Sequence, residues 1–329
     1  MTIEVRMLSL FRKILFSIFF LLICIELILR FAYGFCSAPL YIEDPDYEYI
    51  YAPNQTVRRF GNTIRTNSLS MRSEELSPSD SVTVLLIGDS VVNGGSLTDN
   101  AELASTLLEK RLSAELGRRI RVLNISAGSW GPDNVAAYLR RHGVFNAKAI
   151  GLVASSHDAY DVMTHAAQVG IDPNLPDKQF RIAIVELWSR YIYPIYFRNI
   201  RFNHVYYAPD EETVATKPET ETYVIRKEGD HFNPGFSELK NIAEQHDIPF
   251  FIYLHPEISE VEDGFYNDQG QAIVDYADQD SVRLIRELDI PPLREYYRKR
   301  DVVHYTADGQ KFLADHLFPL FYDYLKEQH

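Results

Sequence analysis

Short apolar runs alternate with amphipathic stretches along most of the chain. Apolar runs of strand length cover residues 82–89, 119–126, 147–155 and 249–256, and residues 281–293 repeat the pattern less clearly. Amphipathic spacing predicts helices at 99–116, 132–142, 237–248 and 307–327. Because strands that alternate with helices form parallel βαβ units, the pattern predicts an α/β protein with three layers, α/β/α, around a central parallel sheet.

One long apolar segment precedes this alternation. Residues 14–35 are almost entirely apolar, and a membrane span needs about 20 such residues. Glu26 and Arg30 interrupt the segment four positions apart, so on a helix they share a face and can pair. Basic residues before the segment and acidic residues after it favour a cytoplasmic tail at 1–13 and a body outside the cytoplasm. The basic residues are Arg6, Arg12 and Lys13, and the acidic ones are Glu43, Asp44, Asp46 and Glu48.

Two other interpretations of residues 14–35 stay open. A cleavable signal peptide would end near the small residues at 36–38, although the apolar segment is long for a signal. A buried core helix is the third interpretation. We expect a transmembrane signal anchor, which makes the protein a single-pass membrane protein with its body in the periplasm if the envelope has two membranes.

Two stretches depart from the alternation of strands and helices. Residues 36–80 are polar and contain four prolines, so we expect an extended leader that packs irregularly on a body formed by residues 81–329. Residues 161–232 are rich in aromatic side chains and are interpreted as an insertion over or beside the site. Most of these side chains are expected to pack on the core, and one or two to face a substrate. They include Trp188, Tyr191, Tyr193, Tyr196, Phe197, Phe202, Tyr206 and Tyr207.

Composition narrows the possible functions. The 329 residues carry a formal net charge of −13, which gives no electrostatic footprint for nucleic acid. The two cysteines, Cys24 and Cys36, lie in or beside the apolar segment. The body therefore has no cysteine for a disulfide, a thiolate metal site or a nucleophile.

Two segments at opposite ends of the body carry candidate chemistry. Ser90 follows the first predicted strand in "LLIGDSVVNGG", and His304 lies in "DVVHYTADGQKF", three residues after Asp301. A serine hydroxyl needs a histidine to take its proton and a third group to orient that histidine. A short Asp-x-x-His loop lets the carboxylate reach Nδ1 while Nε2 faces elsewhere. The alternative for the serine is an inert turn residue, and for the loop an incidental pair of charges.

Together these segments resemble the SGNH, or GDSL, family of serine esterases and acyltransferases. "GDSVVNGG" is similar to the nucleophile block of that family, with Gly94 four residues beyond Ser90, and the Asp-x-x-His segment resembles the last block, with Gly309 five residues after the histidine. The resemblance covers about residues 82–327. It implies a flavodoxin-like SGNH hydrolase fold of the membrane-anchored envelope type and a triad of Ser90, His304 and Asp301.

The resemblance also implies an oxyanion hole, where the match is looser. The backbone N–H groups of Ser90 and Gly128 are the expected donors, with Ser129 or Gly131 as alternatives to Gly128. The family has an Asn side-chain donor where this chain has His157. Its imidazole can donate in place of Asn. The alternative is a structural histidine bonded to Asp158 or Asp161.

The implied function is a membrane-anchored, extracytoplasmic serine esterase that forms an acyl-enzyme on Ser90. Its expected substrates are acyl esters, O-acetyl esters above all, of an acylated small molecule or an envelope or extracellular polysaccharide. An O-acyltransferase, a lipid-active esterase and an inactive binding protein with the same fold are the alternatives. No organic cofactor or metal is expected, because neither His255 with Glu257 nor His165 with Asp161 makes a set of three ligands. No protein partner can be predicted.

Overall fold

The structure, a computed structural model, describes residues 3–77, 82–196, 229–290, 292 and 294–326, and a five-stranded parallel sheet lies at its centre. The strand order is β6-β5-β7-β8-β9. Numbered along the sheet-forming part of the chain, this is the order 2-1-3-4-5 of flavodoxin-like folds. The predicted α/β class is therefore confirmed. The strands are β5 Val82–Gly88, β6 Ile120–Ser126, β7 Ala147–Ser155, β8 Phe250–His255 and β9 Arg283–Arg286.

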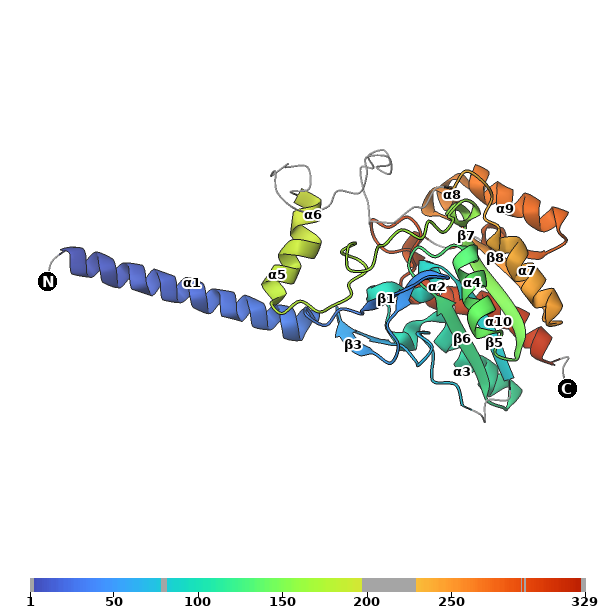
Figure 1. Ribbon diagram of the computed structural model, residues 1–329, viewed down its shortest axis with the longest axis horizontal. Helices are drawn as coiled ribbons and strands as arrows, with labels where there is room; N and C mark the ends of the chain where they lie inside the picture. Colours follow the sequence, from blue (N-terminus) through green and yellow to red (C-terminus); the bar gives the residue numbers. More distant parts are fainter. Residues whose placement is uncertain (1–2, 78–81, 197–228, 291, 293, 327–329) are drawn as a thin grey trace.

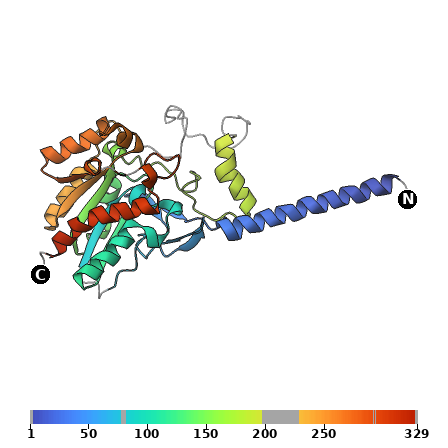
Figure 2. The same ribbon diagram turned by 180° about the vertical axis from the view of Figure 1, so that it is seen from behind.

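Helices cover both faces of the sheet, because successive strand residues point to opposite sides. In β5, Leu85 and Ile87 belong to one core, and Val84 and Leu86 belong to the other. The first core is closed by α4 (Pro132–His142), α7 (Gly235–Gln245) and α9 (Asp268–Gln279). The second is closed by α3 (Ala104–Leu116) and α10 (Ala307–Lys326), which lie together on one side of the sheet in Figure 2.

The helix expected at 99–116 is divided in the structure. Asp99 accepts a hydrogen bond from the N–H of Ala101 and so caps a short 3-10 turn at Asn100–Glu102, and α3 begins only at Ala104. The weak pattern at 281–293 contains the short strand β9 and a 3-10 turn at Glu287–Asp289. Two short helices, α2 (Ser90–Asn93) and α8 (Ile258–Asp263), were not predicted from the sequence.

The leader is more regular than the sequence suggested. It forms two antiparallel hairpins, β1 (Tyr41–Asp44) with β2 (Glu48–Tyr51), and β3 (Thr56–Arg59) with β4 (Asn62–Arg65). In β2, Tyr49 and Tyr51 are both 1% exposed and pack in the core beside α4. Hairpins are found where irregular structure was expected, because aromatic side chains on these short strands pack against the body.

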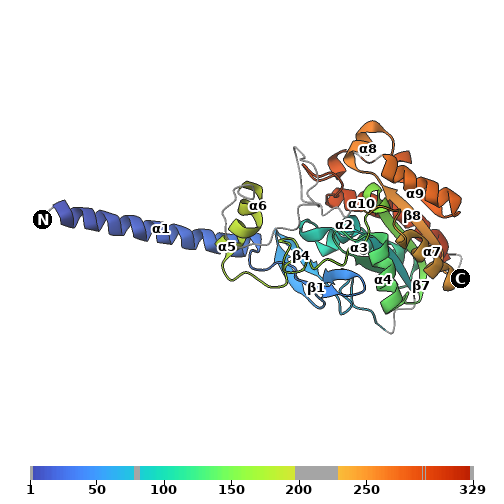
Figure 3. The same cartoon turned by 45° about the horizontal axis from the view of Figure 1, so that its top comes forward.

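The N-terminal helix α1 (Ile3–Tyr33) projects from the α/β body as a long rod (Figures 1 and 3). Its residues Met7–Tyr33 are long and apolar enough to cross a membrane. The predicted insertion contains three short helical segments, α5 (Ala183–Leu187), a π-helical turn (Trp188–Ile192) and α6 (Tyr193–Tyr196). Of these, α5 contacts the end of α1, and the other two lead away from it (Figure 1). Of the aromatic residues named above for the insertion, Phe197, Phe202, Tyr206 and Tyr207 lie outside the described residues.

Candidate active site

The strand β5 ends in a tight turn that presents Ser90. A Cβ atom on Gly88 would lie 2.5 Å from the carbonyl oxygen of Val153 on β7, so a larger residue cannot stand there. Asp89 accepts a hydrogen bond of 2.8 Å from the N–H of Val91 and caps α2. Gly94 ends α2 with φ +72°, a left-handed conformation that favours glycine. Ser90 thus stands at the start of α2, partly exposed, at the carboxyl edge of the sheet.

Ser90, His304 and Asp301 form one continuous chain of hydrogen bonds. The Nε2 atom of His304 lies 2.8 Å from the Oγ atom of Ser90. Its Nδ1 atom lies 2.8 and 3.0 Å from the two carboxylate oxygens of Asp301. A carboxylate only accepts hydrogen bonds, so Nδ1 carries the proton and Nε2 accepts the hydroxyl proton of the serine. The structure brings the three predicted residues together.

The charge of Asp301 is strongly favoured in this setting. Asp301 is 4% exposed, and it accepts hydrogen bonds from the backbone N–H groups of Val303 and His304 as well as from the imidazole. Burial would raise the pKa of Asp301, but the hydrogen bonds and the charge of His304 lower it to about 2. The carboxylate can therefore hold the imidazole in one tautomer and stabilise the imidazolium form.

Two side chains, Gln310, which is buried, and Arg298, which is partly buried, tie the histidine loop to the serine turn across about 200 residues of sequence. Gln310 on α10 donates to the carbonyl of Val91 at 2.7 Å and accepts from the N–H of Ala104 at 2.9 Å. Arg298 donates to the carbonyl of Gly94 at 2.9 Å and to the hydroxyl of Thr98 at 2.8 Å. These contacts set the distance between the two segments that the sequence could only pair by resemblance.

The leader supports the same site, and sequence reasoning missed this. Arg72, 1% exposed, donates to the carbonyls of Asn93, Gly95 and Thr98, which follow the nucleophile turn. Burial lowers the pKa of Arg72 to about 10. On the other side of the turn, the hydroxyl of Tyr49 donates to the carbonyl of Gly128 at 2.9 Å. A single arginine or tyrosine in a polar stretch gives no sequence signal for such a role.

Gly128 lies just beyond β6 and is half-buried, a position expected for a backbone N–H group that donates to an oxyanion. Asn93 joins this edge to α2, because its side chain donates to the carbonyl of Ser126 at 3.0 Å. Gly131 instead serves packing, since a Cβ atom there would lie 2.0 Å from the carbonyl oxygen of Asp161. Donation by the backbone of Ser90 and Gly128 to an oxyanion stays a prediction.

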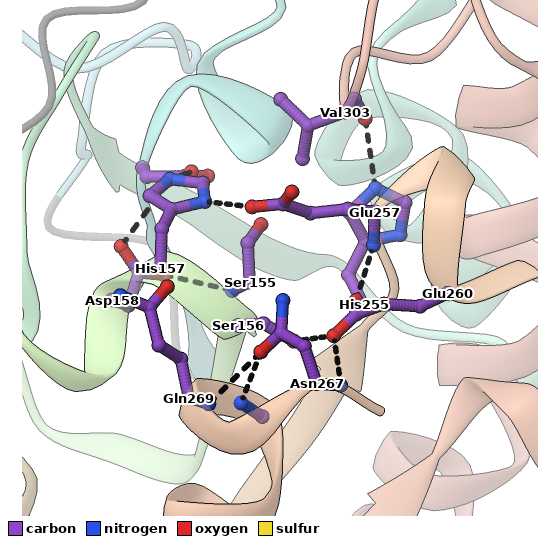
Figure 4. A network of polar contacts seen from close by, with 12 residues as sticks. Ser155, Ser156, His157, Asp158, His255, Glu257, Glu260, Asn267, Gln269 and Val303 are labelled. Atoms are coloured by element: carbon purple, nitrogen blue, oxygen red, sulfur yellow. Dashed lines mark hydrogen bonds and ion pairs between the residues drawn. The ribbon is translucent and has the colours of Figure 1, made fainter. Parts of the chain in front are cut away.

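His157, the expected side-chain donor, lies between carboxylates. It is 7% exposed, its Nδ1 atom lies 3.2 Å from Oε1 of Glu257, and its Nε2 atom lies 3.6 Å from Oδ2 of Asp89 and 3.9 Å from Oδ1 of Asp158. Both ring nitrogens therefore face carboxylates, as Figure 4 shows for Glu257 and Asp158. Asp158 was among the expected partners of a structural histidine, but Glu257 and Asp89 were not. The side-chain donor role has no support in this arrangement.

The carboxylates around His157 perturb one another. Burial alone would lower the pKa of His157, but Asp89 and Glu257 raise it well above its ordinary value. Burial raises the pKa of Asp158 well above its ordinary value, and the negative charge of Asp89 adds to this. The site therefore has a buried layer of interacting ionisable groups directly behind the reactive serine.

The two histidine pairs that were weighed as metal ligands do not form in the described structure. His255 contacts Glu287 at 3.1 Å and the carbonyl of Val303 at 2.8 Å, and the backbone of His165 donates to Glu48. The histidine and carboxylates that do converge are Asp89, His157 and Asp158.

Comparisons with known proteins give a likeness in fold. No model of a protein family matches the sequence, and no curated protein matches it. A lipase/acylhydrolase from Enterococcus faecalis is 10% identical, with a TM-score of 0.41, over 74% of this chain and 96% of that one. An acetyl xylan esterase is 14% identical, with a TM-score of 0.39, over 73% of this chain and 99% of that one. A member of the lipolytic protein G-D-S-L family from Veillonella parvula is 12% identical, with a TM-score of 0.36, over 73% of this chain and 98% of that one. Likenesses at such low sequence identity concern the fold alone. The chemistry of this protein must be derived from its own side chains.

Proposed function

We propose that this protein is a serine esterase that forms an acyl-enzyme on Ser90. The observation that carries the proposal is the unbroken hydrogen-bonded chain from the hydroxyl of Ser90 through His304 to Asp301. Both Ser90 and His304 are partly exposed, whereas Asp301 is buried. A nucleophile and a base that face solvent, with an orienting carboxylate behind them, are the arrangement that acyl transfer requires.

The reaction follows from the positions of the protons. Nε2 of His304 takes the proton of Ser90 as its Oγ attacks the ester carbonyl, and the oxyanion that forms accepts hydrogen bonds from backbone N–H groups at Ser90 and Gly128. The imidazolium then gives its proton to the departing alcohol. A water molecule or another hydroxyl attacks the acyl-enzyme by the same route, so hydrolysis and transfer to an acceptor use the same residues.

We further propose that α1 anchors the protein in a membrane. The carboxylate of Glu26 accepts hydrogen bonds from the N–H groups of Ala183 and Ile184 at 2.8 and 3.0 Å, and it pairs with Arg30 at 2.6 Å. The charges inside the apolar segment thus fix α1 to the body. A signal peptide that is removed would take this support with it, so the contacts favour a retained anchor over a cleaved signal.

The proposed substrates are acyl esters, O-acetyl esters above all, of an envelope or extracellular polysaccharide. The resemblance of the serine and histidine segments supports this class, as does the proposed location outside the cytoplasm. The catalytic residues do not distinguish hydrolysis from O-acyl transfer to a glycan. Product analysis with an added glycan acceptor distinguishes them, since transfer moves the acyl group to the acceptor.

A lipid-active esterase is the second candidate, and one observation favours it. The segment from Ile182 to Tyr196, beside the end of α1, exposes large apolar side chains. A site close to a bilayer could receive acyl chains from it. Rates on nitrophenyl esters of increasing acyl length separate the candidates, because a deacetylase prefers short chains and a lipase prefers long ones.

The experiment that tests the catalytic proposal is labelling of the full chain, in detergent, with a fluorophosphonate probe. We expect wild type to be labelled, Ser90→Ala to be unlabelled and His304→Ala to be labelled far more slowly. Ser96→Ala, on the same loop, is the matched control and should be labelled like wild type. A folded wild-type protein that resists the probe, or equal labelling of Ser90→Ala, would contradict the proposal.

A further inference from the structure

Three buried side chains converge directly behind the nucleophile turn. Asp89, His157 and Asp158 are 1%, 7% and 2% exposed, and one nitrogen or oxygen atom from each lies within 4.8 Å of the other two. Asp89 belongs to the turn after β5, and the other two belong to a 3-10 turn (Ser156–Ala159) after β7. The cluster therefore joins the ends of two neighbouring parallel strands.

Each of the three side chains has one polar atom held by the protein. One oxygen of Asp89 accepts from the N–H of Val91 and one oxygen of Asp158 accepts from the N–H of Ser155, both at 2.8 Å. Nδ1 of His157 is held by the carboxylate of Glu257 at 3.2 Å (Figure 4). A histidine that binds a metal generally donates its other ring N–H to a carboxylate in this way.

The remaining atoms of these side chains point toward one centre and lack hydrogen bonds. Among the described residues, Oδ2 of Asp89 and Oδ1 of Asp158 are buried without a hydrogen-bond partner. They lie 3.6 and 3.9 Å from Nε2 of His157, too far for a hydrogen bond. These separations suit ligands of a shared ion, because bonds of about 2.1 Å in a tetrahedral site place ligand atoms about 3.4 Å apart.

The balance of charge points the same way. In the described part of the chain, the ion-pair contacts of Asp89 and Asp158 are both with His157, whose other nitrogen already faces Glu257. His157 carries at most one positive charge, so Asp89 and Asp158 can both be ionised in this buried position only if a cation joins them, because an uncompensated buried carboxylate is costly. A divalent cation would compensate both inward charges at once.

We propose that Asp89, His157 and Asp158 bind a divalent first-row transition-metal ion, Zn²⁺ or a close analogue. One imidazole nitrogen with two carboxylate oxygens is a donor set that Zn²⁺ accepts, whereas Ca²⁺ and Mg²⁺ prefer oxygen ligands throughout. The ion would link the turn that carries Ser90 to the end of β7 and so act as a structural support. This role does not depend on the esterase proposal, because none of the three atoms belongs to the triad.

The test is the metal content of the full chain, purified in detergent without chelator, incubated with Zn²⁺ and washed. We expect one ion per chain by mass spectrometry of the metal. Asp158→Asn and His157→Gln should each lose most of it, since each removes one of three ligands. Asp230→Asn, which alters an exposed carboxylate paired with His231, is the matched control and should keep the ion.

A second measurement on wild type avoids reliance on variants that fold poorly. Chelation should lower the thermal unfolding midpoint and added Zn²⁺ should restore it, and Co²⁺ in its place should give d–d absorption bands that His157→Gln alters. Ser90→Ala should retain the ion. The metal measurement can therefore be interpreted even if the esterase proposal fails. A wild-type chain that holds no ion after incubation, or equal metal in wild type, Asp158→Asn and His157→Gln, would overturn the proposal and leave a proton or a water molecule as the occupant.

Discussion

The role of Asp301 can be separated from that of the serine by replacing one carboxylate oxygen with an amide nitrogen. In Asp301→Asn, the amide can donate a hydrogen bond to Nδ1 of His304, which leaves the proton on Nε2 and removes the acceptor for the hydroxyl of Ser90. We expect kcat on a short-chain nitrophenyl ester to fall by about 10³–10⁴-fold at neutral pH, with KM little changed. Because the pKa of Asp301 is about 2, the wild-type carboxylate stays charged throughout such an assay.

The control for this prediction is Asp230→Asn, which changes an exposed carboxylate beside His231 and should leave kcat unaltered. Circular dichroism of both variants establishes that they fold. If Asp301→Asn were folded and kept kcat within tenfold of wild type, the carboxylate would not be orienting the base, and the triad would reduce to a pair.

The residues of the triad could be predicted because the residues next to each of them in the sequence indicate its role. Ser90 sits between a buried strand and Gly94, and Asp301 reaches His304 across the two residues between them. The partners of His157 could not be predicted in the same way. Asp89 lies before a helix and Glu257 after a different strand, so their meeting depends on how β5, β7 and β8 lie in the sheet. No local pattern records such a contact.

At the scale of elements, the segment 182–196 combines a buried ion pair with exposed apolar side chains. Glu186, buried, pairs with Arg59 of β3 at 2.6 Å, and this contact holds the segment on the leader. The exposed apolar side chains, which form what we call the apolar face, are Ile182, Val185, Trp188, Tyr193 and Tyr196. Since tryptophan and tyrosine favour the interface between membrane and water, this face fits the surface of the bilayer that α1 would span.

This orientation predicts a fluorescence result, because the protein has two tryptophans in different settings. Trp130 is 1% exposed in the core, and Trp188 is 47% exposed on the apolar face. In vesicles that contain brominated lipids, we expect part of the wild-type tryptophan emission to be quenched and the emission of Trp188→Phe to be unaffected. Flotation of the vesicles controls for insertion of α1. Inserted wild-type protein without quenching would place this face away from lipid.

The elements of the body could be predicted more fully than those of the leader. Strands such as β5 are fully buried apolar runs, and α10 has an extended amphipathic pattern, so each is visible by itself. The strands of the leader have only four residues each, and they mix apolar residues with acidic or basic ones. Such strands depend on the surface they pack against, which is why a polar stretch was expected and two hairpins are found.

At the scale of the whole molecule, His255 connects the far edge of the sheet to the catalytic loop. It ends β8 and is fully buried, with Nδ1 3.1 Å from Glu287 after β9 and Nε2 2.8 Å from the carbonyl of Val303, next to His304. Both partners accept hydrogen bonds, so both nitrogens carry protons and the ring is charged. Tyr297 and Tyr305 enclose the ring, and the hydroxyl of Tyr305 donates to Glu287.

This arrangement predicts that part of the stability is lost in alkaline solution. Burial alone would lower the pKa of His255, but Glu287 and the carbonyl of Val303 raise it above its ordinary value. A raised folded-state pKa gives a stabilisation that is complete below the unfolded pKa, about 6.5, and that disappears as pH rises through the folded value. The thermal unfolding midpoint of wild type should therefore lie above that of His255→Gln by more at pH 6 than at pH 9. Each kcal/mol of stabilisation raises the midpoint by about 2–4 °C. The control is His246→Gln, which replaces an exposed histidine. An equal difference in midpoint between wild type and His255→Gln at both pH values would show that His255 is neutral and supports the catalytic loop by packing alone.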